Sequence, residues 1–213
     1  MAGKRDQLLK LRHSITGPRL VRWLLFAAIP ASVFYFTALL SMHSLGFSVV
    51  DTLRDTVQST GESSLLGFIS NMGIWLWVST IAICLFHGLT KDRSIDPDVR
   101  ELLLLLAGLS LLLAVDDFFL IHDRYIEQNY CYAAYALLAI LLLYRHYENI
   151  LRIDGFAFGI AGTLLFCSTL VDLTRRGIPM AYHHQQIIEE GFKFCGAASW
   201  LYFGCLASMD SRR

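Results

Sequence analysis

Two adjacent aspartates, Asp116 and Asp117, stand near the end of an apolar run that begins at Leu102. A charged side chain near mid-bilayer costs roughly 3 kcal/mol on insertion scales, so such groups are usually paired, protonated or functional. Carboxylates in this setting could bind a metal ion, act as a general base or carry protons. We therefore expect Asp116 and Asp117 to belong to a functional site.

Two other interpretations of the aspartate pair stay open. The helix that contains it could end earlier, which would leave both side chains at the membrane surface. Alternatively, one of them could form an ion pair with Lys193 and so tie the third apolar segment to the last. Lys193 lies between Phe192 and Phe194, and it could neutralise a carboxylate or form a Schiff base.

Further acidic and imidazole groups occur in or beside the corresponding parts of the neighbouring segments. They are His122, Asp123, Asp172, His183, His184, Glu189 and Glu190. Carboxylate and imidazole together suit divalent zinc, manganese or iron. We predict catalytic roles for Asp116, Asp117 and Lys193, and a divalent-metal site formed by Asp116, His122, Asp172, His183, His184 and Glu190.

Simpler interpretations apply to some of these residues. Glu189 and Glu190 precede most of the last apolar segment, and acidic side chains are favoured at a helix N-terminus by its dipole. His183 and His184 could be a solvated pair in a loop. They would contribute to a site only if they folded over the aspartates.

Six apolar segments, each near the ~20 residues that cross a bilayer, must position these groups. They are Val21–Ser41, Leu65–His87, Leu102–Ile121, Tyr130–Tyr147, Phe156–Leu173 and Ile187–Met209. The chain is 55% hydrophobic with a mean hydropathy of +0.49, which is typical of a multi-pass membrane protein. We predict an all-α bundle of six transmembrane helices that forms a single domain over residues 1–213.

Two segments lie outside the predicted spans. Residues 1–20 carry five basic side chains with leucines between them, which indicates an amphipathic segment on the cytoplasmic membrane surface. In the outer connection, residues 42–63, apolar side chains recur at helical spacing, which predicts a short interfacial helix.

Lysine and arginine counts indicate the orientation. With a cytoplasmic N-terminus, 13 of these residues lie on the cytoplasmic side, 4 lie outside, and Lys193 lies within the last span. The positive-inside rule therefore predicts that both termini are cytoplasmic, most simply in a bacterial inner membrane. The 18 basic and 18 acidic residues balance, and no basic stripe indicates nucleic-acid binding.

Helix rise predicts that the intramembrane polar groups share one level. Counting 1.5 Å per residue from the cytoplasmic end places Asp116 about 21 Å into a core about 30 Å thick. The same count places Asn71, Asp172 and Lys193 at about 24 Å. We therefore expect a polar, cation-favouring pocket that opens toward the outer face.

Three functions fit this pattern. The first is a membrane-embedded, metal-dependent, hydrolase-like enzyme that acts on a lipid or lipid-like substrate, with metal-activated water and a carboxylate base. The second is a proton- or cation-coupled carrier. The third is a non-catalytic subunit or assembly factor of a larger membrane complex. The apolar cytoplasmic halves of the spans favour a one-sided pocket over a continuous transport path.

Overall fold

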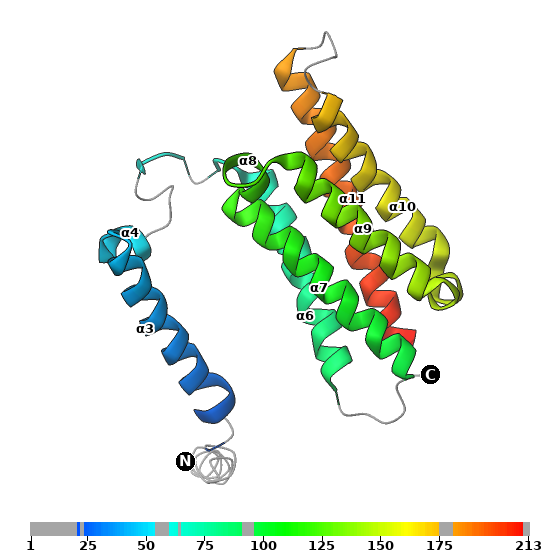
Figure 1. The fold of residues 1–213 in the computed structure, drawn as a ribbon, viewed down its shortest axis with the longest axis horizontal. Helices are drawn as coiled ribbons and strands as arrows, with labels where there is room; N and C mark the ends of the chain where they lie inside the picture. Colours follow the sequence, from blue (N-terminus) through cyan, green and yellow to red (C-terminus); the bar gives the residue numbers. More distant parts are fainter. Residues whose placement is uncertain are drawn as a thin grey trace, which may run out of the picture. The chain divides into compact units, whose positions relative to one another are not determined.

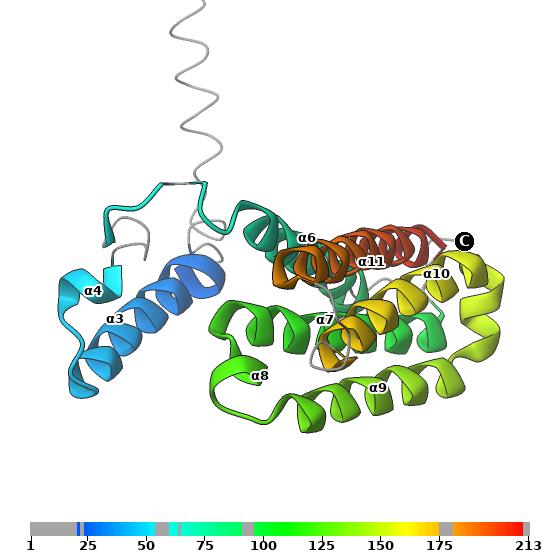
Figure 2. The same cartoon turned by 90° about the horizontal axis from the view of Figure 1, so that it is seen from above.

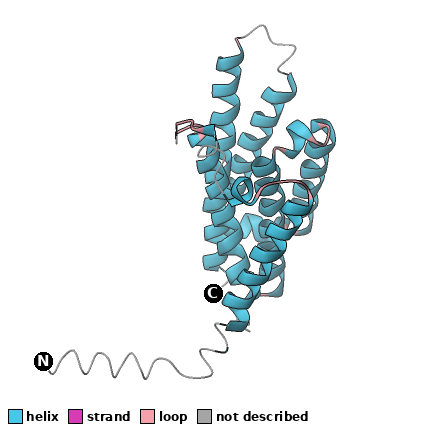
Figure 3. Ribbon diagram, turned by 90° about the vertical axis from the view of Figure 1, so that its left-hand side faces the viewer, coloured by secondary structure: helices cyan, strands magenta, loops and turns pink. Residues whose placement is uncertain are grey.

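The computed structural model describes residues 21, 24–53, 60–63, 65–90, 96–174 and 181–210, and these residues form helices without any strand (Figure 3). The all-helical prediction is therefore confirmed for this part of the chain. The chain divides into two compact units, Met1–Leu66 and Gly67–Arg213, which are described separately. That the whole chain forms one domain stays a prediction.

The described residues of the first unit form a π-helical turn, η1, and the α-helices α3 and α4 (Figure 1). Their bounds are Leu24–Ala28 for η1, Ile29–Ser44 for α3 and Val49–Leu53 for α4. Pro30 lies in the first turn of α3, directly after the π-helical turn. The short α4 lies within the predicted 42–63 connection, whereas residues 1–20 lie outside the described residues.

The second unit is a helical bundle (Figures 1 and 2). Its helices are α6 (Phe68–Leu89), α7 (Pro97–Phe119), α8 (Ile121–Arg124), α9 (Gln128–Arg145), α10 (Tyr147–Thr174) and α11 (Tyr182–Asp210). Within the described residues, α6, α7 and α10 are long and apolar enough to cross a membrane. This supports membrane association, while the number of spans and their orientation stay predictions.

Local side-chain chemistry explains where several helices begin and end. The Asp96 carboxylate accepts a hydrogen bond from the Asp98 N–H at 3.0 Å, and Pro97 occupies the first turn of α7. Leu120, with φ +54°, ends α7 in the left-handed region. Asp154 interrupts the helical backbone of α10, and its carboxylate accepts from the Ala157 N–H at 2.9 Å. A second helical segment therefore begins after Asp154, close to Phe156, where the predicted fifth span begins.

The core lies where α6, α7, α10 and α11 pack most closely. Glycines in α11 permit this approach. A Cβ on Gly204 would lie 3.2 Å from the Cys84 Sγ of α6, and a Cβ on Gly196 would lie 2.8 Å from the Leu165 side chain of α10. Small residues therefore bring these helix backbones together, as is common in membrane bundles.

The helix α9 is held less closely than its neighbours. Of its side chains only Cys131 and Leu142, near its two ends, are buried. Figure 2 shows α9 at the opposite edge of the bundle from α6. The middle of α9 is therefore free to form one wall of a cavity.

Candidate functional site

Asp116 organises the turn between α7 and α8. This residue is only 3% exposed, and its Oδ1 accepts a hydrogen bond from the His122 backbone N–H at 2.9 Å. Its Oδ2 lies 2.8 Å from His122 Nδ1. Because Leu120 turns the chain back, the carboxylate reaches the N–H of His122 in the single turn of α8 and caps it. Asp116 thus lies inside the fold, not at a frayed helix end.

The contact with Asp116 changes the pKa of the His122 imidazole. The hydrogen bond to the Asp116 carboxylate raises the pKa of His122, with a further contribution from the charge of Asp123, while burial opposes the shift. The ring of His122 also lies beside Tyr132 of α9, with 5.6 Å between the ring centroids. The site therefore holds an imidazole whose pKa lies above its ordinary value.

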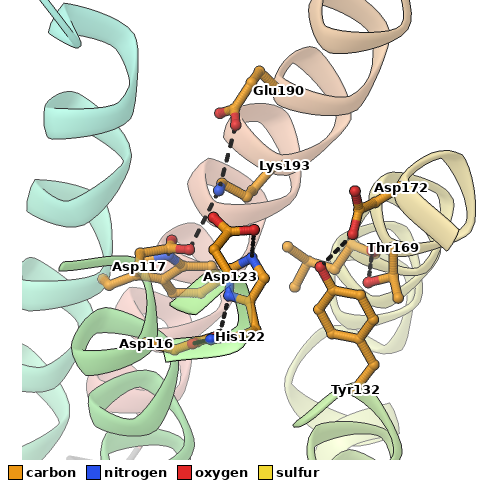
Figure 4. A network of polar contacts seen from close by, with 11 residues as sticks. Asp116, Asp117, His122, Asp123, Tyr132, Thr169, Asp172, Glu190 and Lys193 are labelled. Atoms are coloured by element: carbon orange, nitrogen blue, oxygen red, sulfur yellow. Dashed lines mark hydrogen bonds and ion pairs between the residues drawn. The ribbon is translucent and has the colours of Figure 1, made fainter. Parts of the chain in front are cut away.

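Asp117 connects three helices. Its Oδ2 accepts a hydrogen bond from Trp77 Nε1 of α6 at 3.0 Å, and its Oδ1 accepts one from Lys193 Nζ of α11 at 3.2 Å. Lys193 Nζ also lies 3.5 Å from Glu190 Oε1, one turn away on the same helix (Figure 4). The predicted ion pair between the third and last apolar segments is thus present, and it is made by Asp117 and not by Asp116.

A second polar contact joins α9 to α10. The Tyr132 hydroxyl donates a hydrogen bond to Asp172 Oδ2 at 2.7 Å, and Thr169 lies one turn before Asp172 on α10 (Figure 4). Because α9 buries few side chains, this strong hydrogen bond to a carboxylate fixes one end of that helix.

A cavity of about 670 Å³ lies between α7, α9, α10 and α11. Its lining is divided along its length. Polar and charged side chains line one end, namely Asp116, Asp117, His122, Asn129, Tyr132, Asp172, Glu189 and Lys193. Apolar side chains line the remainder, among them Leu109, Ala139, Leu143, Phe158, Leu165 and Trp200. The cavity is therefore amphipathic, with its polar groups gathered at the end where α7 turns into α8.

Many of the predicted site residues meet at this end. Asp116, Asp117, His122, Asp172 and Lys193 all line the cavity, and Glu190 contacts Lys193. This placement agrees with the predicted common level for residues of the third, fifth and last segments. Their predicted catalytic and metal-binding roles stay predictions.

Other predicted residues lie elsewhere. His183 and His184 are exposed in the first turns of α11, where their rings face each other with centroids 4.0 Å apart, and neither lines the cavity. Asn71 is exposed on α6 and does not line it. The positions of Glu189 and Glu190 also do not fit the interpretation that they cap a helix N-terminus. Because α11 begins at Tyr182, Glu189 and Glu190 lie beyond its first turn, where the dipole effect has weakened.

The side chains proposed as metal ligands do not fit one ion as they are arranged. Within the described residues, no three His, Cys, Asp or Glu side chains converge in a way that could hold a metal ion. Asp116 is bonded to His122, Asp172 accepts from Tyr132, and Glu190 faces Lys193. The arrangement instead offers a charged, hydrogen-bonding end to an apolar cavity.

Sequence reasoning did not single out the residues that α9 contributes. Asn129, Tyr132 and Tyr135 recur at three-residue spacing, which places them on one helix face, and all three line the cavity. That polar stripe in an apolar helix was a usable signal. The hydrogen bond from Trp77 to Asp117 could not be predicted from the sequence, because a tryptophan in a span usually packs against other helices or lies at the membrane interface.

The family described as "Domain of unknown function (DUF8692)" matches this chain over residues 22–207. Because the match covers most of the chain, including every residue that lines the cavity, the chain belongs to this family. No curated protein and no solved structure matches it.

Proposed function

We propose that this member of the DUF8692 family binds one lipid-like amphiphile inside the bilayer. The headgroup would occupy the polar end of the cavity beside Asp117, Lys193 and Tyr132, and the alkyl chain would lie along the apolar wall. The observation that carries the proposal is the division of one cavity into a charged end and an apolar remainder. Ligand pockets commonly combine apolar walls with a few polar groups that fix orientation.

The size of the cavity suits a single chain. Its volume of about 670 Å³ lies in the range of pockets that hold one small ligand. On α9 it extends from Asn129 to Leu143, and a rise of 1.5 Å per residue makes this about 21 Å. A long, narrow molecule with one alkyl chain would fill this space.

The setting of the proposal is the membrane arrangement predicted from the sequence. If the chain crosses a bacterial inner membrane six times with both termini in the cytoplasm, the polar end of the cavity would lie near the outer surface of that membrane. A headgroup would then lie close to the level of lipid headgroups, with its chain parallel to the lipid chains. An amphiphile could enter without leaving that orientation.

A second candidate is an enzyme that modifies the bound amphiphile, and the Asp116–His122 pair favours it. A carboxylate on Nδ1 fixes the tautomer and orientation of an imidazole, as a general acid or base requires. His122 lines the cavity and is oriented in this way. No metal enters this proposal, because the donor side chains are engaged with other partners.

Native mass spectrometry tests the binding proposal with a matched pair of variants. Ala136 lines the cavity, whereas Ala134, two residues away on α9, does not. The purified protein and its Ala136→Phe and Ala134→Phe variants would each be incubated with hexadecanol, hexadecanoic acid or hexadecylamine. We expect at least one of these molecules to bind one per chain to the wild type and to Ala134→Phe, but not to Ala136→Phe. Failure of all three to bind, or equal binding to Ala136→Phe, would overturn the proposal.

A further inference from the structure

The apolar part of the cavity has a floor of packed side chains. The lining residues farthest from the polar end are Leu109 on α7, Leu143 on α9, Phe158 on α10 and Trp200 on α11. About one helical turn farther on, the chain is buried and no longer lines the cavity, at Leu106, His146 and Phe203. Within the described helices, the cavity therefore ends at this level.

Phe158 is the aromatic side chain on which this floor is centred. Its ring is 8% exposed and lies against the rings of Trp200 and Phe203, with centroids 5.4 and 5.2 Å away. Because Phe203 is fully buried in the core, the Phe158 ring cannot move deeper without displacing other packed side chains. On α10 the lining runs from Phe158 to Asp172, and a rise of 1.5 Å per residue makes this about 21 Å.

Trp200 holds the neighbouring part of the floor in one orientation. Its Nε1 donates a hydrogen bond to Ser110 Oγ at 3.0 Å, and that hydroxyl donates to the Leu106 carbonyl at 2.7 Å. Both side chains are buried, so turning the indole would leave its N–H without a partner inside the core. The ring of Trp200 therefore stays beside Phe158 and supports it.

From this arrangement, we infer that Phe158 sets the length of the alkyl chain that the cavity accepts, with Trp200 and Phe203 holding its ring in place. This inference rests on the proposed function, because it concerns the chain of the same ligand. An alkyl chain that reaches Phe158 fills the apolar part of the cavity. A longer chain must fold back, displace the packed rings or leave its headgroup outside the polar end, and overfilling a packed interior is unfavourable.

Two alcohols that differ only in chain length test the inference. Hexadecanol and the longer eicosanol would compete for the purified full-length protein in nonionic detergent, and the bound molecules would be quantified by mass spectrometry. We expect hexadecanol to bind at least about fivefold more tightly than eicosanol, because the longer chain overfills the cavity. The amines and the acids of the same two chain lengths would repeat the comparison with other headgroups.

A matched pair of variants on α10 then connects the preference to Phe158. Phe158 lines the cavity, whereas Phe156, two residues away, is 78% exposed and does not. Phe158→Ala would open apolar space below the alkyl chain, which a longer chain can fill. This variant should bring the affinities for eicosanol and hexadecanol within about twofold of each other, while Phe156→Ala keeps the wild-type preference. Phe158→Leu, a smaller change, should give an intermediate preference and replaces Phe158→Ala if that variant fails to fold.

The outcomes separate this inference from the proposed function. Equal binding of the two chain lengths to the wild type, or tighter binding of the longer one, would overturn the inference. An unchanged preference in the folded Phe158 variants, or the same change in Phe156→Ala, would also overturn it. If Ala136→Phe still blocked binding in any of these cases, the cavity would remain the site of an amphiphile. Absence of binding by both chain lengths with every headgroup would overturn both proposals.

Discussion

Lys193 shows how a charged residue is accommodated within an apolar helix. Its ammonium group reaches Asp117 and Glu190, and its side chain is 26% exposed. Removing one member of such a pair leaves the other charge without compensation, whereas removing both does not. The pair is therefore best understood as an electrostatic unit that connects α7 to α11.

Lys193→Met should lower the free energy of unfolding by roughly 3 kcal/mol, because Asp117 loses its cation. The double variant Asp117→Asn with Lys193→Met should recover part of that loss. Both can be measured by unfolding in mixtures of nonionic detergent and dodecyl sulfate. Additive losses in the double variant would show that the two charges do not stabilise each other.

His122 gives the site a dependence on pH. Its pKa is higher in the folded protein than its ordinary value of 6.5, because it is bonded to Asp116. A raised folded-state pKa contributes stability that is fully present below the unfolded value and is lost as pH rises through the folded one. The protonated pair therefore stabilises the fold most on the acidic side of neutrality.

His122→Gln should thus destabilise the protein more at about pH 6 than at about pH 9. The difference in unfolding midpoint between variant and wild type should narrow as pH rises. His183→Gln alters an exposed histidine outside the cavity and serves as the control. If the difference in unfolding midpoint between His122→Gln and the wild type stayed constant from about pH 6 to about pH 9, the pairing of His122 with Asp116 would be contradicted.

Among the elements, α10 is built from two helical segments joined at Asp154. The backbone of Asp154 is extended, with φ −169° and ψ 87°, and its carboxylate accepts from Ala157 N–H. This side chain caps the segment that lines the cavity from Phe158 to Leu173. The break in the helical backbone of α10 thus occurs at Asp154, whose side chain starts the next segment.

Asp154→Ala should therefore cost about 1 kcal/mol of stability, as the loss of an N-cap usually does. Asp154→Ser, which retains an oxygen acceptor at the same position, should cost less. Chemical or thermal unfolding of the two purified variants compares them directly. Equal losses would mean that the carboxylate does not act as a cap.

At the level of the whole bundle, the approach of α10 to α11 fixes the cavity walls that these helices supply. Gly196 lies at their contact, where an added Cβ would meet the Leu165 side chain at 2.8 Å and its backbone nitrogen at 3.1 Å. Gly191, on the same helix, has nothing within 4 Å of the same added atom. The two glycines thus form a natural comparison.

Gly196→Ala should destabilise the protein by about 2 kcal/mol, because overpacking forces the two helices apart. Gly191→Ala should be neutral or slightly stabilising, since alanine is the better helix former. Unfolding free energies and hexadecanol affinity would both be measured, and both should fall in Gly196→Ala. If the two variants behaved alike, close packing of these helices would not determine the cavity.

Sequence periodicity and hydropathy were sufficient to predict much of this molecule. The long apolar runs predicted helices near α6, α7, α9, α10 and α11, because burying backbone groups in lipid requires helical hydrogen bonding. Helix rise also predicted that Asp116, Asp172 and Lys193 would lie at similar levels. Each of these properties depends only on residues close together in one helix, so the amino-acid sequence is enough to predict it.

Only the tertiary structure decided which partner each polar group takes. The two adjacent aspartates project from α7 in different directions, about 100° apart on a helix, so Asp116 meets His122 while Asp117 meets Lys193 and Trp77. Helix rotation and the start of α11 at Tyr182 also decided that His183 and His184 remain outside the cavity. Rotation about a helix axis depends on packing against every neighbour at once, and no single stretch of sequence determines it.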